Sequence, residues 1–62
     1  MILNIKLKKA RKKAGLTQAQ IAQKVNISVR HYQSIEAGTS KSSVDIAKLI
    51  AQVLNSTVED LF

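Results

Sequence analysis

Apolar residues recur along the chain at intervals of three and four, which is the period of an amphipathic helix. In the first segment these positions are Leu3, Leu7, Ala10 and Ala14. The same spacing continues in three later segments, at Ile21, Ala22 and Val25, at Tyr32 and Ile35, and at Val44, Ala47, Ile50, Ala51 and Leu54. No segment alternates between apolar and polar residues over a useful length, so the pattern predicts helices rather than strands.

Residues suited to helix ends divide the chain into five parts. Four of them tolerate the left-handed backbone conformation that closes a helix: Gly15, Asn26, Gly38 and Asn55. Shortly after each comes a hydroxyl side chain that can cap the next helix, at Thr17, Ser28, Ser43, and Ser56 or Thr57. The segments Thr17–Gln20 and Ser56–Glu59 both fit capping boxes. We therefore predict helices over Leu3–Ala14, Gln18–Val25, Val29–Ala37, Val44–Leu54 and Val58–Phe62.

Composition narrows the classes of function. The 62 residues suffice for one small domain, residues 1–62, which buries only about 60% of its unfolded surface. The chain has no cysteine, so disulfides and cysteine-ligated zinc are excluded, and His31 is the single imidazole. We therefore expect no enzyme activity, no catalytic residues, no metal site and no cofactor. His31 is best interpreted as exposed or close to a phosphate.

Positive charge is concentrated in the first half of the chain. Residues 1–30 carry eight lysines and arginines and no acid, whereas residues 31–62 carry two lysines and four acids. Such a positive face favours a polyanion, although a solvated face that only aids solubility is the plain alternative. We interpret Lys8, Lys9, Lys12 and Lys13 as the source of a long-range field rather than as specific contacts.

A cytoplasmic protein without membrane contact is expected. No apolar run reaches the roughly 18 residues that suggest a membrane span, and the opening Met1-Ile2-Leu3 is too short for a signal peptide. Binding to a membrane surface is disfavoured as well, because no large aromatic or leucine face opposes the lysines.

The stretch from residue 16 to residue 38 carries the clearest functional pattern. Two short helical segments flank a turn at Asn26-Ile27, and the small Ala22 stands where the two helices must cross closely. Tyr32 and Ile35 can pack the second helix inward. This arrangement indicates a helix-turn-helix, whose second helix places its N-terminal side chains in the major groove of DNA.

On these residues the sequence resembles the Cro/C1-type, or XRE-type, helix-turn-helix domains of phage repressors and bacterial regulators. The resemblance covers about Leu7 to Phe62, with matches at Arg11, Gly15, Leu16, Thr17, Gln18, Ile21, Ala22, Val25, Ile35, Glu36, Gly38, Leu49, Ile50, Ala51, Leu54, Val58, Glu59, Asp60, Leu61 and Phe62. It implies an all-α fold, a compact, lambda-repressor-like bundle of five helices. It also implies that Arg11 pairs with Glu36 and ties the first helix to the recognition helix.

The resemblance and the helical spacing together assign eight DNA-binding positions. Gln18 is expected to touch a phosphate from the start of the second helix. The recognition helix would present Ser28, Val29, Arg30, Gln33 and Ser34, and the loop after it Thr39 and Lys41. Arg30 is the best candidate for reading a base, since a guanidinium matches guanine O6 and N7, whereas Val29 offers apolar contact to a thymine methyl group.

The favoured function is a sequence-specific DNA-binding transcriptional regulator, most simply a repressor on a palindromic operator. The expected partners are double-stranded DNA and a second copy, bound through the C-terminal helices by Phe62 and the region near Val53, while Val58 and Leu61 cover the core. In the monomeric alternative, Phe62 folds back as a core plug. The alternative function is an antitoxin, or another protein-interaction module, which would bring in a regulatory protein partner.

Overall fold

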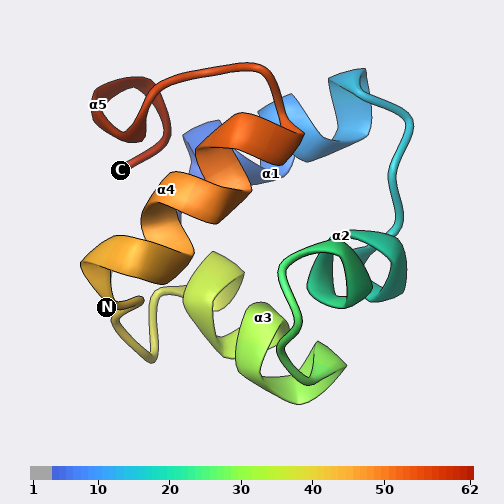
Figure 1. Ribbon diagram of the computed structural model, residues 1–62, viewed down its shortest axis with the longest axis vertical. Coiled ribbons are helices and arrows are strands. Elements are labelled where there is room, and N and C mark those ends of the chain that lie inside the picture. Colours follow the sequence, from blue (N-terminus) through green and yellow to red (C-terminus); the bar gives the residue numbers. More distant parts are fainter. Residues whose placement is uncertain (1–3) are drawn as a thin grey trace.

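Five α helices follow one another in the order that the cap residues predict (Figure 1). The computed structural model describes residues 4–62, and no strand occurs in that part of the chain. The helices are α1 (Ile5–Lys13), α2 (Gln18–Lys24), α3 (Val29–Ala37), α4 (Val44–Val53) and α5 (Val58–Leu61). The all-α prediction is confirmed, and four of the helices end one residue earlier than predicted. The predicted start at Leu3 lies outside the described residues, and Asn4 is the N-cap of α1.

Hydroxyl side chains begin the last four helices, as predicted. Each accepts a hydrogen bond of 3.0 to 3.2 Å from the backbone N–H three residues further on, at Thr17, Ser28, Ser43 and Thr57. The first capping box is confirmed, because the Thr17 backbone N–H in turn donates to Oε1 of Gln20 at 2.8 Å. These bonds satisfy backbone donors that have no partner within the helix.

The second predicted capping box, Ser56–Glu59, is wrong by one residue. Thr57 is the N-cap of α5, in the extended conformation that an N-cap requires (φ −118°, ψ 158°). Ser56 belongs to the end of the preceding helix, because its backbone N–H donates to the Ala51 carbonyl at 2.8 Å. Asn55 (φ 54°) adopts the left-handed conformation that closes α4, and Ser56 is therefore part of the C-terminal cap of that helix rather than the N-cap of α5.

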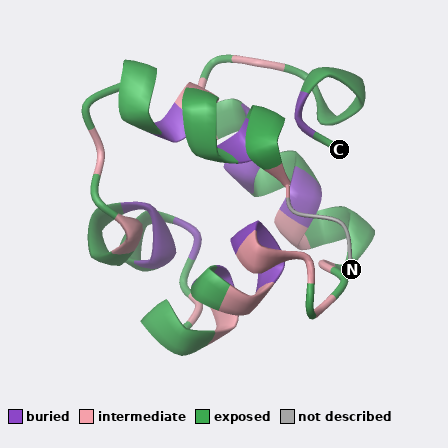
Figure 2. Ribbon diagram, turned by 180° about the vertical axis from the view of Figure 1, so that it is seen from behind, coloured by how far each residue is buried: buried purple, intermediate pink, exposed green. Residues whose placement is uncertain are grey.

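The hydrophobic core lies where the inner faces of all five helices meet. Its fully buried large side chains come from α1, α2, α3 and α4, and they are Leu7, Ile21, Tyr32, Ile35 and Ile50. Leu61 of α5 is also buried and completes the cluster. Figure 2 shows the buried positions on the sides of the helices that face the interior.

Three predicted apolar positions lie at the surface instead. Ala14 is exposed because α1 has ended there and the chain turns away through Gly15. Val44 is 70% exposed, since it is the first residue of α4 and precedes the part of that helix that reaches the core. Val58, expected to cover the core, is 36% exposed at the start of α5.

Candidate nucleic-acid interface

α2 and α3 form the predicted helix-turn-helix. The chain reverses at Asn26, which adopts the left-handed conformation (φ 60°), and the Ile27 backbone N–H donates to the Ala22 carbonyl at 3.0 Å. Ala22 is fully buried, which lets the two helices approach, and Tyr32 holds α3 from the other side of the turn. In Figures 1 and 2 this pair of helices lies at one side of the molecule, and α5 lies at the opposite side.

The outer face of α3 carries the predicted recognition residues. Val29, Arg30 and Gln33 are exposed, and Ser34 is half-buried beside them. Arg30, Gln33 and Ser34 lie on the side of the helix that faces away from the buried Tyr32. Val29 lies closer to the Tyr32 side but is exposed because it is the first residue of α3. The helix therefore presents a guanidinium, an amide and an isopropyl group, which together suit base edges and thymine methyl groups.

Three of the predicted hydroxyl contacts already have partners within the protein. Ser28 caps α3 and accepts from the His31 backbone N–H at 3.0 Å, which leaves its own O–H as a donor. Ser34 donates to the Arg30 carbonyl at 3.1 Å, and Thr39 donates to the Ser34 carbonyl at 3.2 Å. A phosphate oxygen only accepts hydrogen bonds, so Ser28 is better placed for a phosphate than Ser34 or Thr39.

The loop after α3 keeps its basic residue at the surface. Its first two backbone N–H groups, from Thr39 and Ser40, donate to the Ser34 carbonyl at 3.0 and 3.3 Å and so fold the loop against the end of α3. Lys41, the next residue of the loop, is exposed. This arrangement places an exposed positive charge in the loop that follows the C-terminal end of α3.

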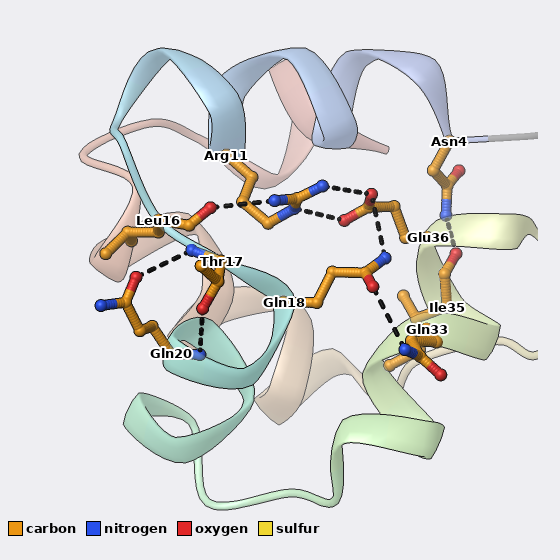
Figure 3. A network of polar contacts seen from close by, with 9 residues as sticks. All are labelled: Asn4, Arg11, Leu16, Thr17, Gln18, Gln20, Gln33, Ile35 and Glu36. Carbon is orange, nitrogen blue, oxygen red and sulfur yellow. Dashed lines mark hydrogen bonds and ion pairs between the residues drawn. The ribbon is translucent and has the colours of Figure 1, made fainter.

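A pair of glutamine amides joins the start of α2 to α3, and sequence reasoning did not find it. The Gln33 amide donates to Oε1 of Gln18 at 3.2 Å, and the Gln18 amide donates to Oε1 of Glu36 at 3.4 Å (Figure 3). Each amide keeps one N–H for an outside ligand. Gln18, predicted to touch a phosphate, thus also positions Gln33 on the recognition face.

The predicted ion pair between Arg11 and Glu36 is present and anchors this network. Nε of Arg11 donates to Oε2 of Glu36 at 2.9 Å, and Nη2 donates to Oε1 at 3.0 Å. The third guanidinium nitrogen, Nη1, donates to the Leu16 carbonyl at 2.9 Å. Both residues are buried, at 8% and 6% exposure, and one guanidinium links α1, the loop before α2, and α3.

Charge in this network shifts the pKa values of its members. Burial is the largest influence on Glu36 and alone would raise its pKa, but the hydrogen bonds and positive charge of Arg11, together with the neighbouring Tyr32 and Gln18, outweigh burial, so the pKa lies below its usual value. The same pairing raises the pKa of Arg11. Burial, together with the nearby Glu36 carboxylate, raises the pKa of Tyr32, whose hydroxyl has no hydrogen-bond partner among the described residues.

Residues 4–62 hold no group of three or more His, Cys, Asp or Glu side chains that could bind a metal ion. None of their helices combines the length and the apolar character that crossing a membrane requires.

Comparison with known proteins identifies the family. Residues 7–61 match the family described as Helix-turn-helix. The chain is 33% identical over 60 residues to an uncharacterized HTH-type transcriptional regulator of Archaeoglobus fulgidus, an alignment that covers 97% of this chain and 86% of the relative. No solved structure matches the chain. The match over most of its length, with the geometry of α2 and α3, shows that the chain belongs to the Cro/C1-type, or XRE-type, helix-turn-helix family of DNA-binding transcriptional regulators.

Proposed function

We propose that this protein is a sequence-specific repressor that binds a palindromic operator as a homodimer and inserts α3 into the major groove. The observation that carries the proposal is the exposed face of Val29, Arg30 and Gln33 on a helix held rigidly by the network from Arg11 to Gln33. A rigidly held helix can present its side chains to base edges in one fixed geometry. Regulators of this family generally act by binding rather than by catalysis.

Each of the eight assigned residues has a role in this proposal. Arg30 reads a guanine, Gln33 reads an adenine through its Oε1 and its remaining N–H, and Val29 contacts a thymine methyl group. Gln18, Ser28 and Lys41 contact the phosphates on either side of that groove. Ser34 and Thr39, whose hydroxyls donate within the protein, lie beside the backbone without donating to it. Repression follows most simply, since a protein seated on a promoter occludes it. Its site of action is the cytoplasm, where bacterial and archaeal DNA lies.

An exposed apolar patch between the start of α4 and the end of the chain supports the homodimer. Phe62 is 43% exposed and lies outside the core cluster, so it is not a core plug. It lines a hollow of about 480 Å³ together with Val44, Ala47 and Val58. Val53, named as a second contact from the sequence, packs against the core instead, so the partner face moves to the patch formed by Val44, Val58 and Phe62.

The alternative function, an antitoxin or other protein-interaction module, uses the same patch. Its exposed side chains would suit an apolar segment of a different protein as well as a second copy. An antitoxin of this fold would still bind DNA through α3, so the two functions differ in the occupant of the patch.

Selection of binding sequences from a pool of randomised duplexes tests the proposal. We expect enrichment of an inverted repeat whose half-sites lie about 34–36 Å apart, one turn of the duplex. Failure to enrich any sequence over the starting pool would overturn sequence-specific binding. Enrichment of a single half-site without symmetry would overturn the homodimer and leave base readout intact.

A further inference from the structure

α1 presents three lysines to a hollow that borders the recognition helix. The hollow has a volume of about 490 Å³. Lys8, Lys9 and Lys12 line one side of it, and Gln18 and Gln33 line the other. Those two glutamines belong to the network that supports the recognition face, so the hollow continues that face toward α1.

The spacing along α1 explains why these lysines gather on one side. Residues 5, 8, 9 and 12 follow intervals of three, four and seven, which place them on one face of a helix. Ile5, at 54% exposure, adds an apolar surface to this row of charges. Lys6 and Lys13 are also exposed, but they lie about a quarter turn away around the helix and do not line the hollow.

Bonds near both ends of this lysine row fix α1 against α3. At the start of α1, the Asn4 backbone N–H donates to the Glu36 carbonyl at 3.1 Å, and the Asn4 side chain donates to the Ile35 carbonyl. Near the end of α1, Arg11 pairs with the Glu36 carboxylate. These bonds hold α1, which carries the lysines, against α3, and Figure 3 shows the Asn4 and Arg11 side chains that make them.

The hollow has a net positive charge available to an outside ligand. Glu36 is the acid among its described lining residues, and that carboxylate is already neutralised by Arg11. The three lysine ammonium groups are exposed, and no ion pair joins them to an acid within residues 4–62. A ligand with repeated negative charges and apolar patches between them fits this lining.

We propose that this hollow binds the sugar–phosphate backbone beside the major groove that α3 enters, with Lys8 and Lys12 on phosphates and Ile5 against a deoxyribose. The inference rests on the DNA-binding function proposed above and extends its contact surface onto α1. DNA is favoured over an acidic protein segment because the hollow shares Gln18 and Gln33 with the recognition face. One backbone strand can therefore run from that face into the hollow without a break.

Two double variants with the same net charge distinguish direct contacts between lysines and phosphates from a general electrostatic attraction to DNA. The test variant is Lys8→Ala with Lys12→Ala, and the control is Lys6→Ala with Lys13→Ala. Each removes two exposed lysines of α1, one of them in its last turn, so helix stability and overall field change alike. Lys8→Gln with Lys12→Gln repeats the test with polar replacements, and thermal melts verify that all variants fold.

The measurement is affinity for a mixed-sequence duplex of roughly 20 base pairs over a range of salt concentrations. We expect the test variant to lower the log–log salt slope by about 1.8, because each phosphate contact contributes about 0.9. The control should lower it by less than about 0.5. Equal losses in the two variants would overturn the proposal in favour of a diffuse field.

Two other outcomes would overturn the proposal in different ways. If the wild-type protein shows no salt-dependent binding to DNA, both the proposed DNA-binding function and the proposed backbone contact in the hollow are wrong. Wild-type DNA binding that is unchanged in the test variant, together with loss of binding to a poly-glutamate peptide, would assign the hollow to an acidic protein partner. Sequence-specific binding through Arg30 would survive that second result.

Discussion

Arg11 of α1 and Glu36 of α3 form a buried, bidentate ion pair with hydrogen bonds of 2.9 and 3.0 Å. Glu36 lies in the last turn of α3, where a negative charge opposes the helix macrodipole. The guanidinium offsets that unfavourable position and also accounts for the burial of the carboxylate. Glu36 in turn accepts from Gln18, so the pair supports the residues that position the recognition face.

A double-mutant cycle on this pair should show strong coupling. We expect Arg11→Ala and Glu36→Ala each to lower the free energy of unfolding by about 3 kcal/mol, since each leaves a buried charge unpaired. The double variant should lose at least about 1 kcal/mol less than the sum of the two. Urea unfolding followed by circular dichroism gives these values, and Arg11→Lys provides a milder variant if Arg11→Ala does not fold. Strict additivity would contradict the direct contact.

The pair also makes stability depend on pH in the acid range. Because folding lowers the pKa of Glu36, its contribution is complete above the unfolded pKa of about 4.3 and is lost as the pH falls through the lower folded value. The wild-type free energy of unfolding should therefore fall more steeply below about pH 5 than that of Glu36→Gln. Identical slopes for the two proteins would show that the carboxylate gains nothing from folding.

Tyr32 should tolerate loss of its hydroxyl but not of its ring. The hydroxyl is buried and has no hydrogen-bond partner among the described residues, whereas the ring fills the centre of the core. We expect Tyr32→Phe to change the free energy of unfolding by less than about 1 kcal/mol, or to raise it. Tyr32→Leu, which shrinks the ring, should cost several times more. A loss above about 2 kcal/mol for Tyr32→Phe would mean that the hydroxyl is hydrogen-bonded in solution.

The helix pattern of this chain was predictable because its signals are local. Left-handed residues such as Asn26 and caps such as Thr17 act within one turn of the backbone, and the structure confirms both. The pairing of Arg11 with Glu36 followed from the family resemblance, since no local rule joins residues so far apart. The exposure of Val44 was missed because periodicity identifies a helix face but not where along the helix its neighbours end.

In the candidate site, too, local features were predictable and features that depend on helix packing were not. The outer face of α3, with Arg30 and Gln33, follows from helical spacing and is exposed as predicted. The bond between Gln33 and Gln18 could not be predicted, because it depends on the angle at which α2 and α3 cross. The hollow beside α1 likewise depends on how α1 lies against α3. The sequence therefore predicted a positive charge at Lys8 and Lys12 but not that these side chains line a hollow.

Substitutions in the apolar patch of Val44, Val58 and Phe62 should convert the dimer to a monomer. We expect the wild-type protein to sediment as a dimer at micromolar concentration, and Val44→Ser with Phe62→Ser to sediment as a 6.8 kDa monomer. Val29→Ser is the control, because Val29 is another exposed apolar residue but lies on the recognition helix. A wild-type monomer, unchanged when the selected duplex is added, would contradict the homodimer. Dissociation caused by Val29→Ser would place the interface elsewhere.

Sequence recognition by α3 is tested most directly at Arg30, the residue proposed to read a base. Fluorescence anisotropy compares the selected duplex with a scrambled one for wild type, Arg30→Ala and Lys41→Ala. We predict that Arg30→Ala loses about 1–3 kcal/mol on the selected duplex and relaxes discrimination at one base pair, while Lys41→Ala weakens both duplexes alike. Equal weakening of both duplexes by Arg30→Ala, or equal wild-type affinity for the two, would contradict sequence recognition by α3.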